Sequence, residues 1–284
     1  MHILTGGNVA TIRTMLHGCV GVAMLMLTAC EQTIDVELPY QERIVVNGFV
    51  GMEEATWGIP PTIHITRTLP PLDQTDTARM RIDDVEAVIT HRGADYPLAK
   101  GSHTLMRLPV ESSQWAGDSV TLRVRGGGMT AFSTTYIPKR PEIVSATVVD
   151  FTTDWGETIK GIQINVRAEA GSCVFATSTD APFSSYGNYP MSLWQVPVVV
   201  PGQRGSATTD IVLGIPLRYR FDSGDSVQVT IYAMDGVYER YRSSYAPGGG
   251  PFSSGGANPL FNVTGDAIGM FVGVSFRTTT VGIP

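Results

Sequence analysis

The sequence predicts an all-β protein, in which two consecutive immunoglobulin-like β-sandwich domains follow an N-terminal signal segment. Three observations favour this fold class. Short segments in which apolar and polar residues alternate recur along the chain, and this pattern is typical of half-buried strands. Glycine (31 residues) and proline (18 residues) are frequent, as expected for many turns. Only one convincing patch, Val237 to Tyr245, has the apolar spacing of a helix.

The N-terminal segment has the layout of a secretory signal. Arg13 is its only charged residue, and an unbroken apolar run of nine residues extends from Cys19 to Leu27. A helix that stays in the membrane needs about 20 such residues, so this run is too short. The run ends in Leu27-Thr28-Ala29-Cys30, which resembles the lipobox of bacterial lipoproteins. We therefore expect residues 1–29 to be removed by cleavage between Ala29 and Cys30, and the Cys30 thiol to carry lipid.

The rest of the chain divides into a tether and two domains. Residues 30–40 are acidic and lead from the lipidated cysteine to the first strand, as a tether would. Pro138-Lys139-Arg140-Pro141 has two prolines within four residues, which cannot lie inside a central strand. We therefore place the domain boundary there, with a first sandwich at residues 41–138 and a second at residues 141–284.

Each domain contains a series of expected strands. Those of the first domain are Ile44–Val50, Thr62–Arg67, Val85–Thr90, Ser119–Arg125 and Met129–Ile137. Those of the second are Ile143–Phe151, Ile159–Ala168, Cys173–Thr177, Leu193–Val200, Thr208–Leu213, Val227–Ala233 and Ala267–Thr280. A Gly-Asp-Ser turn precedes an alternating strand once in each domain, at Gly117 and at Gly224, which supports two related sandwiches.

Charge and cysteine content limit the classes of function. Removal of Arg13 with the signal segment changes the net charge from −6 to −6 − 1 = −7, which argues against nucleic acid or an acidic lipid surface as a partner. Of the three cysteines, only Cys173 would remain as a thiol, so the mature body has no internal disulfide. Because Cys173 lies in an apolar strand pattern, we interpret it as a small core residue rather than a nucleophile.

Several motifs, in their order along the chain, resemble one family. After the lipobox come Ile-Asp-Val-Glu-Leu-Pro and Ile-Val-Val-Asn-Gly-Phe-Val, then a Tyr-x-x-Tyr patch and a glycine-rich loop. The chain closes with Asn258-Pro259-Leu260-Phe261-Asn262-Val263 and Gly269-Met270-Phe271-Val272-Gly273. Together these resemble the Bacteroidetes-type lipoproteins known as domain of unknown function 4249. The chain has Thr264-Gly265-Asp266 where the closing motif of that family has Asn-Gly.

The resemblance implies an outer-membrane lipoprotein whose gene often lies beside that of a TonB-dependent receptor. It also implies possible exposure on the cell surface, for which Glu31, Asp35 and Glu37 would serve as sorting residues. The resemblance implies no catalytic residues and no cofactor for this chain. The lipid bilayer, through acylated Cys30, and a TonB-dependent receptor are the partners that follow from it.

The residues themselves predict no enzyme and no metal site. A lipase-like hydrolase would need a histidine downstream of its serine, yet the last histidine, His103, precedes both Gly-Asp-Ser triplets. The histidines His64, His91 and His103 have no close ligand pairing, and we expect His64 on the exposed face of its strand. Asp73, Asp76, Asp83 and Asp84 lack the spacing of a calcium loop.

The best binding candidate is an aromatic segment in the second domain. Phe183, Tyr186, Tyr189 and Trp194 lie within twelve residues, and such rings bind sugars or peptides at low entropic cost. The alternative, which we favour, is that these rings cover the core of the domain or pack between the domains. The sequence thus predicts a non-catalytic accessory lipoprotein of an envelope uptake system, with a glycan or peptide as possible cargo. A structural surface protein, either an adhesin or a fimbrial subunit trimmed after Arg43, is the alternative.

Overall fold

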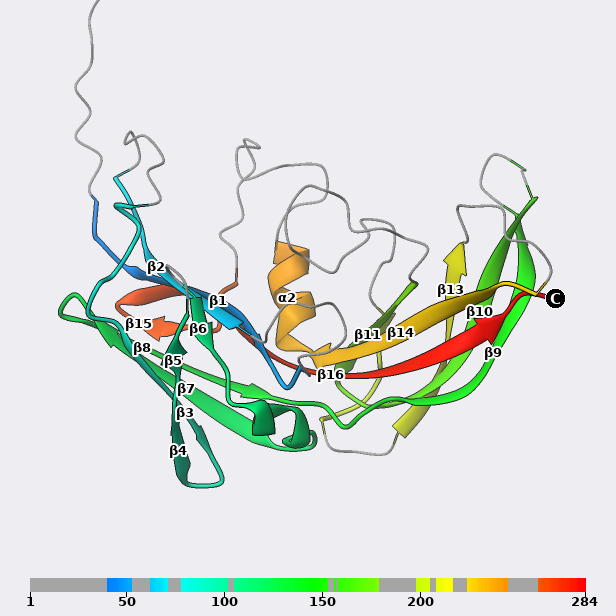
Figure 1. Ribbon diagram of the computed structural model, residues 1–284, viewed down its shortest axis with the longest axis horizontal. Coiled ribbons are helices and arrows are strands. Elements are labelled where there is room, and N and C mark those ends of the chain that lie inside the picture. Colours follow the sequence, from blue (N-terminus) through cyan, green and yellow to red (C-terminus); the bar gives the residue numbers. More distant parts are fainter. Residues whose placement is uncertain are drawn as a thin grey trace, which may run out of the picture. The chain divides into compact units, whose positions relative to one another are not determined.

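The computed structural model describes residues 40–52, 62–70, 78–101, 105–152, 156, 158–178, 198–204, 208–216, 224–244 and 260–284. Residues 41–284 form one compact unit. Its described residues lie mostly in strands, together with the helix α2 (Val237–Ser244) and the 3-10 helix η1 (Val110–Gln114) (Figure 1). The predicted all-β fold is therefore confirmed. No helix in these ranges is long and apolar enough to cross a membrane.

The strands agree closely with the segments of alternating polarity. Those before the proline pair are β1 (Ile44–Val50), β2 (Thr62–Arg67), β3 (Glu86–His91), β4 (Ala94–Pro97), β5 (Ala99–Lys100), β6 (Leu105–Arg107), β7 (Ser119–Gly126) and β8 (Met129–Tyr136). Those after it are β9 (Glu142–Thr152), β10 (Thr158–Glu169), β11 (Ser172–Ser178), β12 (Val198–Val199), β13 (Thr208–Pro216), β14 (Ser226–Asp235), β15 (Thr264–Gly265) and β16 (Ala267–Gly282). The short strands β4, β5, β6 and β15 were not predicted, because two to four residues are too few to establish a period.

The strands form three sheets. The longest has the order β12-β11-β14-β16-β1-β2-β6-β5, and it faces a five-stranded sheet (β15-β8-β7-β3-β4) and a three-stranded sheet (β13-β10-β9). One core fills the space next to the five-stranded sheet and includes Ile44, Ile63 and Leu122. A second core lies next to the three-stranded sheet and includes Ile164 and Val229. The two halves of the long sheet therefore have separate cores.

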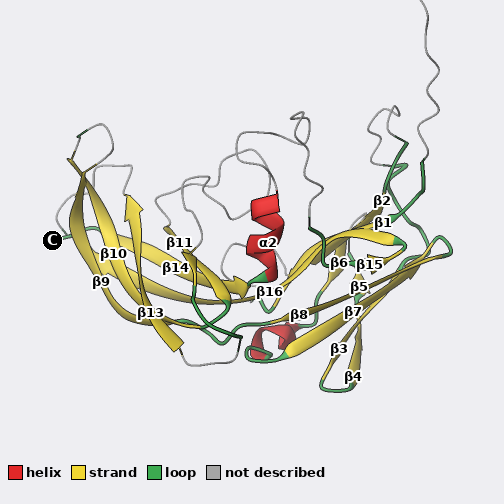
Figure 2. Ribbon diagram, turned by 180° about the vertical axis from the view of Figure 1, so that it is seen from behind, coloured by secondary structure: helices red, strands yellow, loops and turns green. Residues whose placement is uncertain are grey.

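Both faces of β16 are buried from Gly269 to Ser275. Phe271 belongs to the first core, whereas the adjacent residues Met270 and Val272 belong to a third cluster with Tyr238 of α2. Because neighbouring residues of a strand point to opposite faces, α2 covers the face of the sheet opposite to the first core (Figure 2). Val237 and Tyr241 pack against this third cluster, as their spacing predicted, and Tyr245 lies outside the described residues.

The last strand departs from the expected division into domains. Residues 267–273 of β16 run parallel to β1, and residues 274–282 run antiparallel to β14 (Figure 1). The chain does pass from β8 to β9 at the proline pair, but β16 belongs to the long sheet on both sides of it. Residues 41–138 and 141–284 are thus not two independent units. The alternation of apolar and polar residues shows which side chains are buried, but it does not show which strand pairs with which. The sequence therefore could not reveal that β16 is shared between the two halves.

Two glycines allow β16 to fit between its neighbours. A Cβ added to Gly269 would lie 1.9 Å from the carbonyl oxygen of Val46, and φ is +127° there, in the region that favours glycine. A Cβ added to Gly273 would lie 2.0 Å from the carbonyl oxygen of Tyr136. β16 can therefore approach β1 and β8 only because these two positions carry no side chain.

Candidate functional site

The predicted functional residues lie outside the described residues. This is true of Ala29 and Cys30 at the cleavage site and of all four rings of the aromatic segment, Phe183, Tyr186, Tyr189 and Trp194. Their roles stay predictions. Two other expectations are confirmed: His64 is exposed on β2, and Cys173 is fully buried. Burial raises the pKa of the Cys173 thiol to about 12, so this group is a poor nucleophile at neutral pH.

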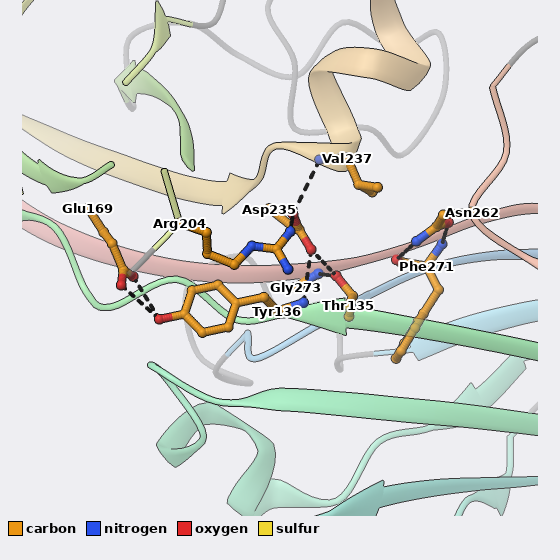
Figure 3. Close-up of polar contacts among 9 residues, drawn as sticks. All are labelled: Thr135, Tyr136, Glu169, Arg204, Asp235, Val237, Asn262, Phe271 and Gly273. Carbon is orange, nitrogen blue, oxygen red and sulfur yellow. Dashed lines mark hydrogen bonds and ion pairs between the residues drawn. The ribbon is translucent and has the colours of Figure 1, made fainter. Parts of the chain in front are cut away.

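The most concentrated polar site in the described part is a junction around Asp235, at the end of β14 (Figure 3). This carboxylate is 2% exposed, and one oxygen accepts hydrogen bonds from the Thr135 hydroxyl (3.0 Å) and the Tyr136 N–H (2.9 Å). Its other oxygen accepts bonds from Arg204 (2.5 Å) and from the Val237 N–H (3.3 Å) at the start of α2. One side chain thus joins β8, β14, α2 and the segment before β13.

A second buried acid, Glu169, lies at the end of β10 and is also 2% exposed. Its two oxygens accept bonds from the Tyr136 hydroxyl at 2.8 and 3.0 Å, and one of them also accepts a bond from the Lys139 N–H at 2.9 Å. The Lys139 carbonyl in turn accepts a bond from the Ser275 hydroxyl of β16. The link between β8 and β9 is therefore held by both acids and by β16.

Arg204 lies over this junction, with 49% of its side chain accessible. Its guanidinium carbon is 5.3 Å from the centre of the Tyr136 ring, within the range of a cation–π contact. Burial raises the pKa of Tyr136 above its ordinary value, and the hydrogen bond to Glu169 raises it further. The phenol therefore stays protonated and acts as a donor.

The hydrogen bonds of the junction join strands that lie far apart in the chain. A shallow depression is lined by Tyr136, Glu169, Arg204 and Asp235 among others, and it leaves no enclosed space large enough for a water molecule. Its acids already accept hydrogen bonds from protein groups: Asp235 from the Thr135 hydroxyl and Arg204, and Glu169 from the Tyr136 hydroxyl and the Lys139 N–H. Because removing a partner from a buried charged group is costly, the same bonds fix the strands around it.

Asn262 supports β16 where β14 does not reach it. Its amide donates to the Phe271 carbonyl (2.6 Å) and accepts from the Phe271 N–H (2.9 Å), so it replaces a neighbouring strand (Figure 3). The Gly273 N–H donates to the Thr135 hydroxyl at 2.8 Å in the same way. Asn262 belongs to the closing motif quoted above, but the sequence did not indicate this role.

A smaller polar cluster surrounds Asp118 in the first Gly-Asp-Ser turn. The Asp118 carboxylate contacts His91 Nε2 and Arg92 at 2.9 Å each, and the His91 ring stacks on Trp115 at 4.6 Å. The hydrogen bond with His91 lowers the pKa of Asp118, and Arg92 contributes to the same shift. Gly117 and Gly224 both have left-handed φ values immediately before β7 and β14, so the predicted turns at both triplets are confirmed.

Sequence reasoning missed the two buried acids. Glu169 and Asp235 each end a strand and look like ordinary polar strand ends, so the sequence carried no signal of their burial. Within the described ranges, no three His, Cys, Asp or Glu side chains gather in a way that could hold a metal ion. Comparison with family models gave no match, and neither did comparison with curated proteins.

Proposed function

We propose that this protein is an outer-membrane lipoprotein without catalytic activity. In this proposal it is an accessory or binding component of an envelope uptake system, it partners a TonB-dependent receptor, and its body consists of two immunoglobulin-like sandwiches that share β16. The observation that carries the proposal is the lipobox-like sequence Leu27-Thr28-Ala29-Cys30 behind a short apolar run. Its likeness to the family named above supports the same location.

The position of the first strand is consistent with a lipid-tethered body. β1 begins at Ile44, which is 44 − 30 = 14 residues after Cys30. A fully extended chain of that length spans at most about 46–50 Å. The folded unit would therefore stay within that distance of the lipid headgroups, close enough to contact a receptor in the same membrane.

The buried polar groups also support a binding role over an enzymatic one. Glu169 and Asp235 are the two buried acids in the described part of the chain. Both are used as acceptors for backbone and side-chain donors that hold β8 in place. They would be poor acid–base groups while these bonds persist.

A fimbrial subunit trimmed after Arg43 is the less well supported alternative. The peptide bond between Arg43 and Ile44 is held on both sides: the Arg43 carbonyl accepts from the Thr68 N–H, and the Ile44 N–H donates to the Asp266 carbonyl, each at 2.9 Å. The Arg43 N–H also donates to the Thr68 hydroxyl. Because a protease needs its substrate strand free, cleavage there would require the start of β1 to detach from the sheet.

Tagged purification from detergent-solubilised outer membrane, followed by mass spectrometry, tests the proposed partner. We expect a TonB-dependent receptor in near-stoichiometric amount. Recovery of the protein alone, as a ladder of multimers, would contradict the uptake role and favour the structural one. A Cys30→Ser variant, with Cys19→Ser as its control, should leave the membrane fraction and lose the receptor.

The same purification tests the aromatic segment. A Tyr186→Ala, Tyr189→Ala variant should recover less receptor or cargo than wild type, with little change in melting temperature. Phe132→Ala is the matched control, because Phe132 is an aromatic residue of β8 that is 44% exposed. A decrease in melting temperature of more than about 8 °C, which corresponds to roughly 2–4 kcal/mol for a chain of this size, would place the rings in the core instead.

A further inference from the structure

The first and last strands of the described chain lie side by side. β1 pairs with β16 in parallel over seven residues, from Ile44↔Ala267 to Val50↔Gly273. β1 follows the N-terminal residues directly, and β16 ends two residues before Pro284. Because the two strands are parallel, the N-terminal end of β1 and the C-terminal end of β16 point away from each other along the long sheet (Figure 1).

A force applied between these two ends acts along the strands. Such a force slides β1 past β16, so it loads all seven residue pairs at the same time. On its other side β1 pairs with β2 at five positions, from Ile44↔Arg67 to Gly48↔Ile63, and it must slide past this strand as well. Under this load β1 leaves the sheet only when many backbone hydrogen bonds break together.

The hydrogen bonds of β1 are also shielded from water. Ile44 and Val46 have no exposed surface and belong to the first core, whereas Phe49 packs against the third cluster on the opposite face. Just before the strand, Glu42 binds Arg67 of β2 at 3.1 Å. Water competes poorly for hydrogen bonds that are covered on both faces, so these bonds resist opening under load.

We propose that β1 and β16 form a mechanical clamp, through which the folded body carries force between its N-terminal end and the second sandwich. β1 takes up the force from the residues before it, and β16 passes it beyond Gly273 to β14, with which it pairs at nine positions. The clamp follows from the order and direction of the strands. The force on it in the cell rests on the proposed function, because the proposed lipid anchor at Cys30 lies at the N-terminal end.

Force spectroscopy on single molecules of the full-length chain tests the proposal. Forced unfolding reports the barrier to unfolding rather than the equilibrium stability, so it is sensitive to how the strands are loaded. In the first geometry, handles are attached to Cys30 and to a cysteine added after Pro284. The chain carries Cys19→Ser and is made without export, so that Cys30 keeps its thiol. Cys173 is buried and does not compete for the handles.

The second geometry pulls the antiparallel strands β9 and β10 apart from their open end. Handles at Glu142→Cys and Arg167→Cys, in a Cys19→Ser, Cys30→Ser chain, replace paired residues whose side chains are 63% and 41% exposed. This force acts across the strands, so the residue pairs break one after another. We expect a high-force peak when the chain is pulled from its ends and the loss of that peak in the second geometry. Equal forces in the two geometries would overturn the proposal.

Two glycine variants separate the clamp from general stability. A Cβ at Gly269 of β16 would lie 1.9 Å from the Val46 carbonyl oxygen and would push β1 away, whereas a Cβ at Gly126 of β7 would meet the Ile82 side chain at 2.8 Å, outside the clamp. We expect Gly269→Ala and Gly126→Ala both to lower the melting temperature, but only Gly269→Ala to lower the unfolding force between the chain ends. An equal loss of force in both variants would overturn the proposal.

The outcomes also separate the clamp from the proposed function. If Gly269→Ala does not fold, the comparison of the two pulling geometries still decides whether the clamp exists. A chain that unfolds at high force from its ends but carries no lipid on Cys30 in membranes would refute the anchor and keep the clamp. A lipidated chain without the high-force peak would do the reverse.

Discussion

Replacement of Asp235 by alanine should strongly destabilise the fold, because its carboxylate accepts four hydrogen bonds at the junction. The half-exposed Arg204 could bind water instead, but the buried Thr135 hydroxyl and the part-buried Tyr136 N–H would lose their acceptor. Each unsatisfied buried donor costs about 1–3 kcal/mol. With two such donors, we expect Asp235→Ala to lower the free energy of unfolding by about 2–6 kcal/mol.

Equilibrium unfolding in urea, followed by far-UV circular dichroism, measures this change. Asp150→Asn is the matched control, since Asp150 is 57% exposed and bonds Lys160 at the surface. An exposed ion pair contributes about 0.2–1 kcal/mol, so the control should remain close to wild type. If Asp235→Ala lost no more stability than Asp150→Asn, the junction would not hold the strands together as described.

Three further predictions concern single positions. Gly273→Ala should lower the free energy of unfolding in urea by about 1–3 kcal/mol or more, because its Cβ would meet the Tyr136 carbonyl. Gly282→Ala on the same strand is the control and should leave the stability unchanged, because a Cβ there would lie in open space. Wild type should have a higher free energy of unfolding than Asp118→Asn at pH 7, and this difference should shrink below about pH 4. The reason is that a carboxyl whose pKa is lowered on folding stabilises the fold only while it is ionised. A difference that is unchanged at pH 3 would contradict this. In a Cys19→Ser, Cys30→Ser variant, a thiol dye should label Cys173 only after denaturation, and rapid labelling of the native protein at pH 8 would show that the thiol is accessible.

The local structure could be predicted from the sequence, whereas the sharing of β16 could not. Ile44–Val50 and Thr62–Arg67 were predicted with their observed bounds, because alternation and burial have the same period in a strand with one buried face. The run from Gly269 to Gly273 also indicated a strand. Its two partners, β1 and β14, depend on packing between distant segments, for which alternation carries no information.

The polar junction was missed for a related reason. Each acid looks like an ordinary strand end in the sequence, and its partners lie far away along the chain: Glu169 binds the link that follows β8, and Asp235 binds Thr135 at a separation of 100 residues. The opposite holds for the signal segment. Its pattern is local and chemical, so it can be recognised in the sequence alone, and it stays a prediction because it lies outside the described residues.

The most direct test of the central proposal is the mass of the N-terminal peptide of the mature protein, purified from membranes and digested with a protease. We predict a peptide that begins at Cys30 and carries a diacylglycerol thioether, and that Cys30→Ser abolishes both the cleavage and the lipid. A mature protein that keeps residues 1–29, or that begins at another residue without lipid on Cys30, would contradict the proposed anchor and the location that depends on it.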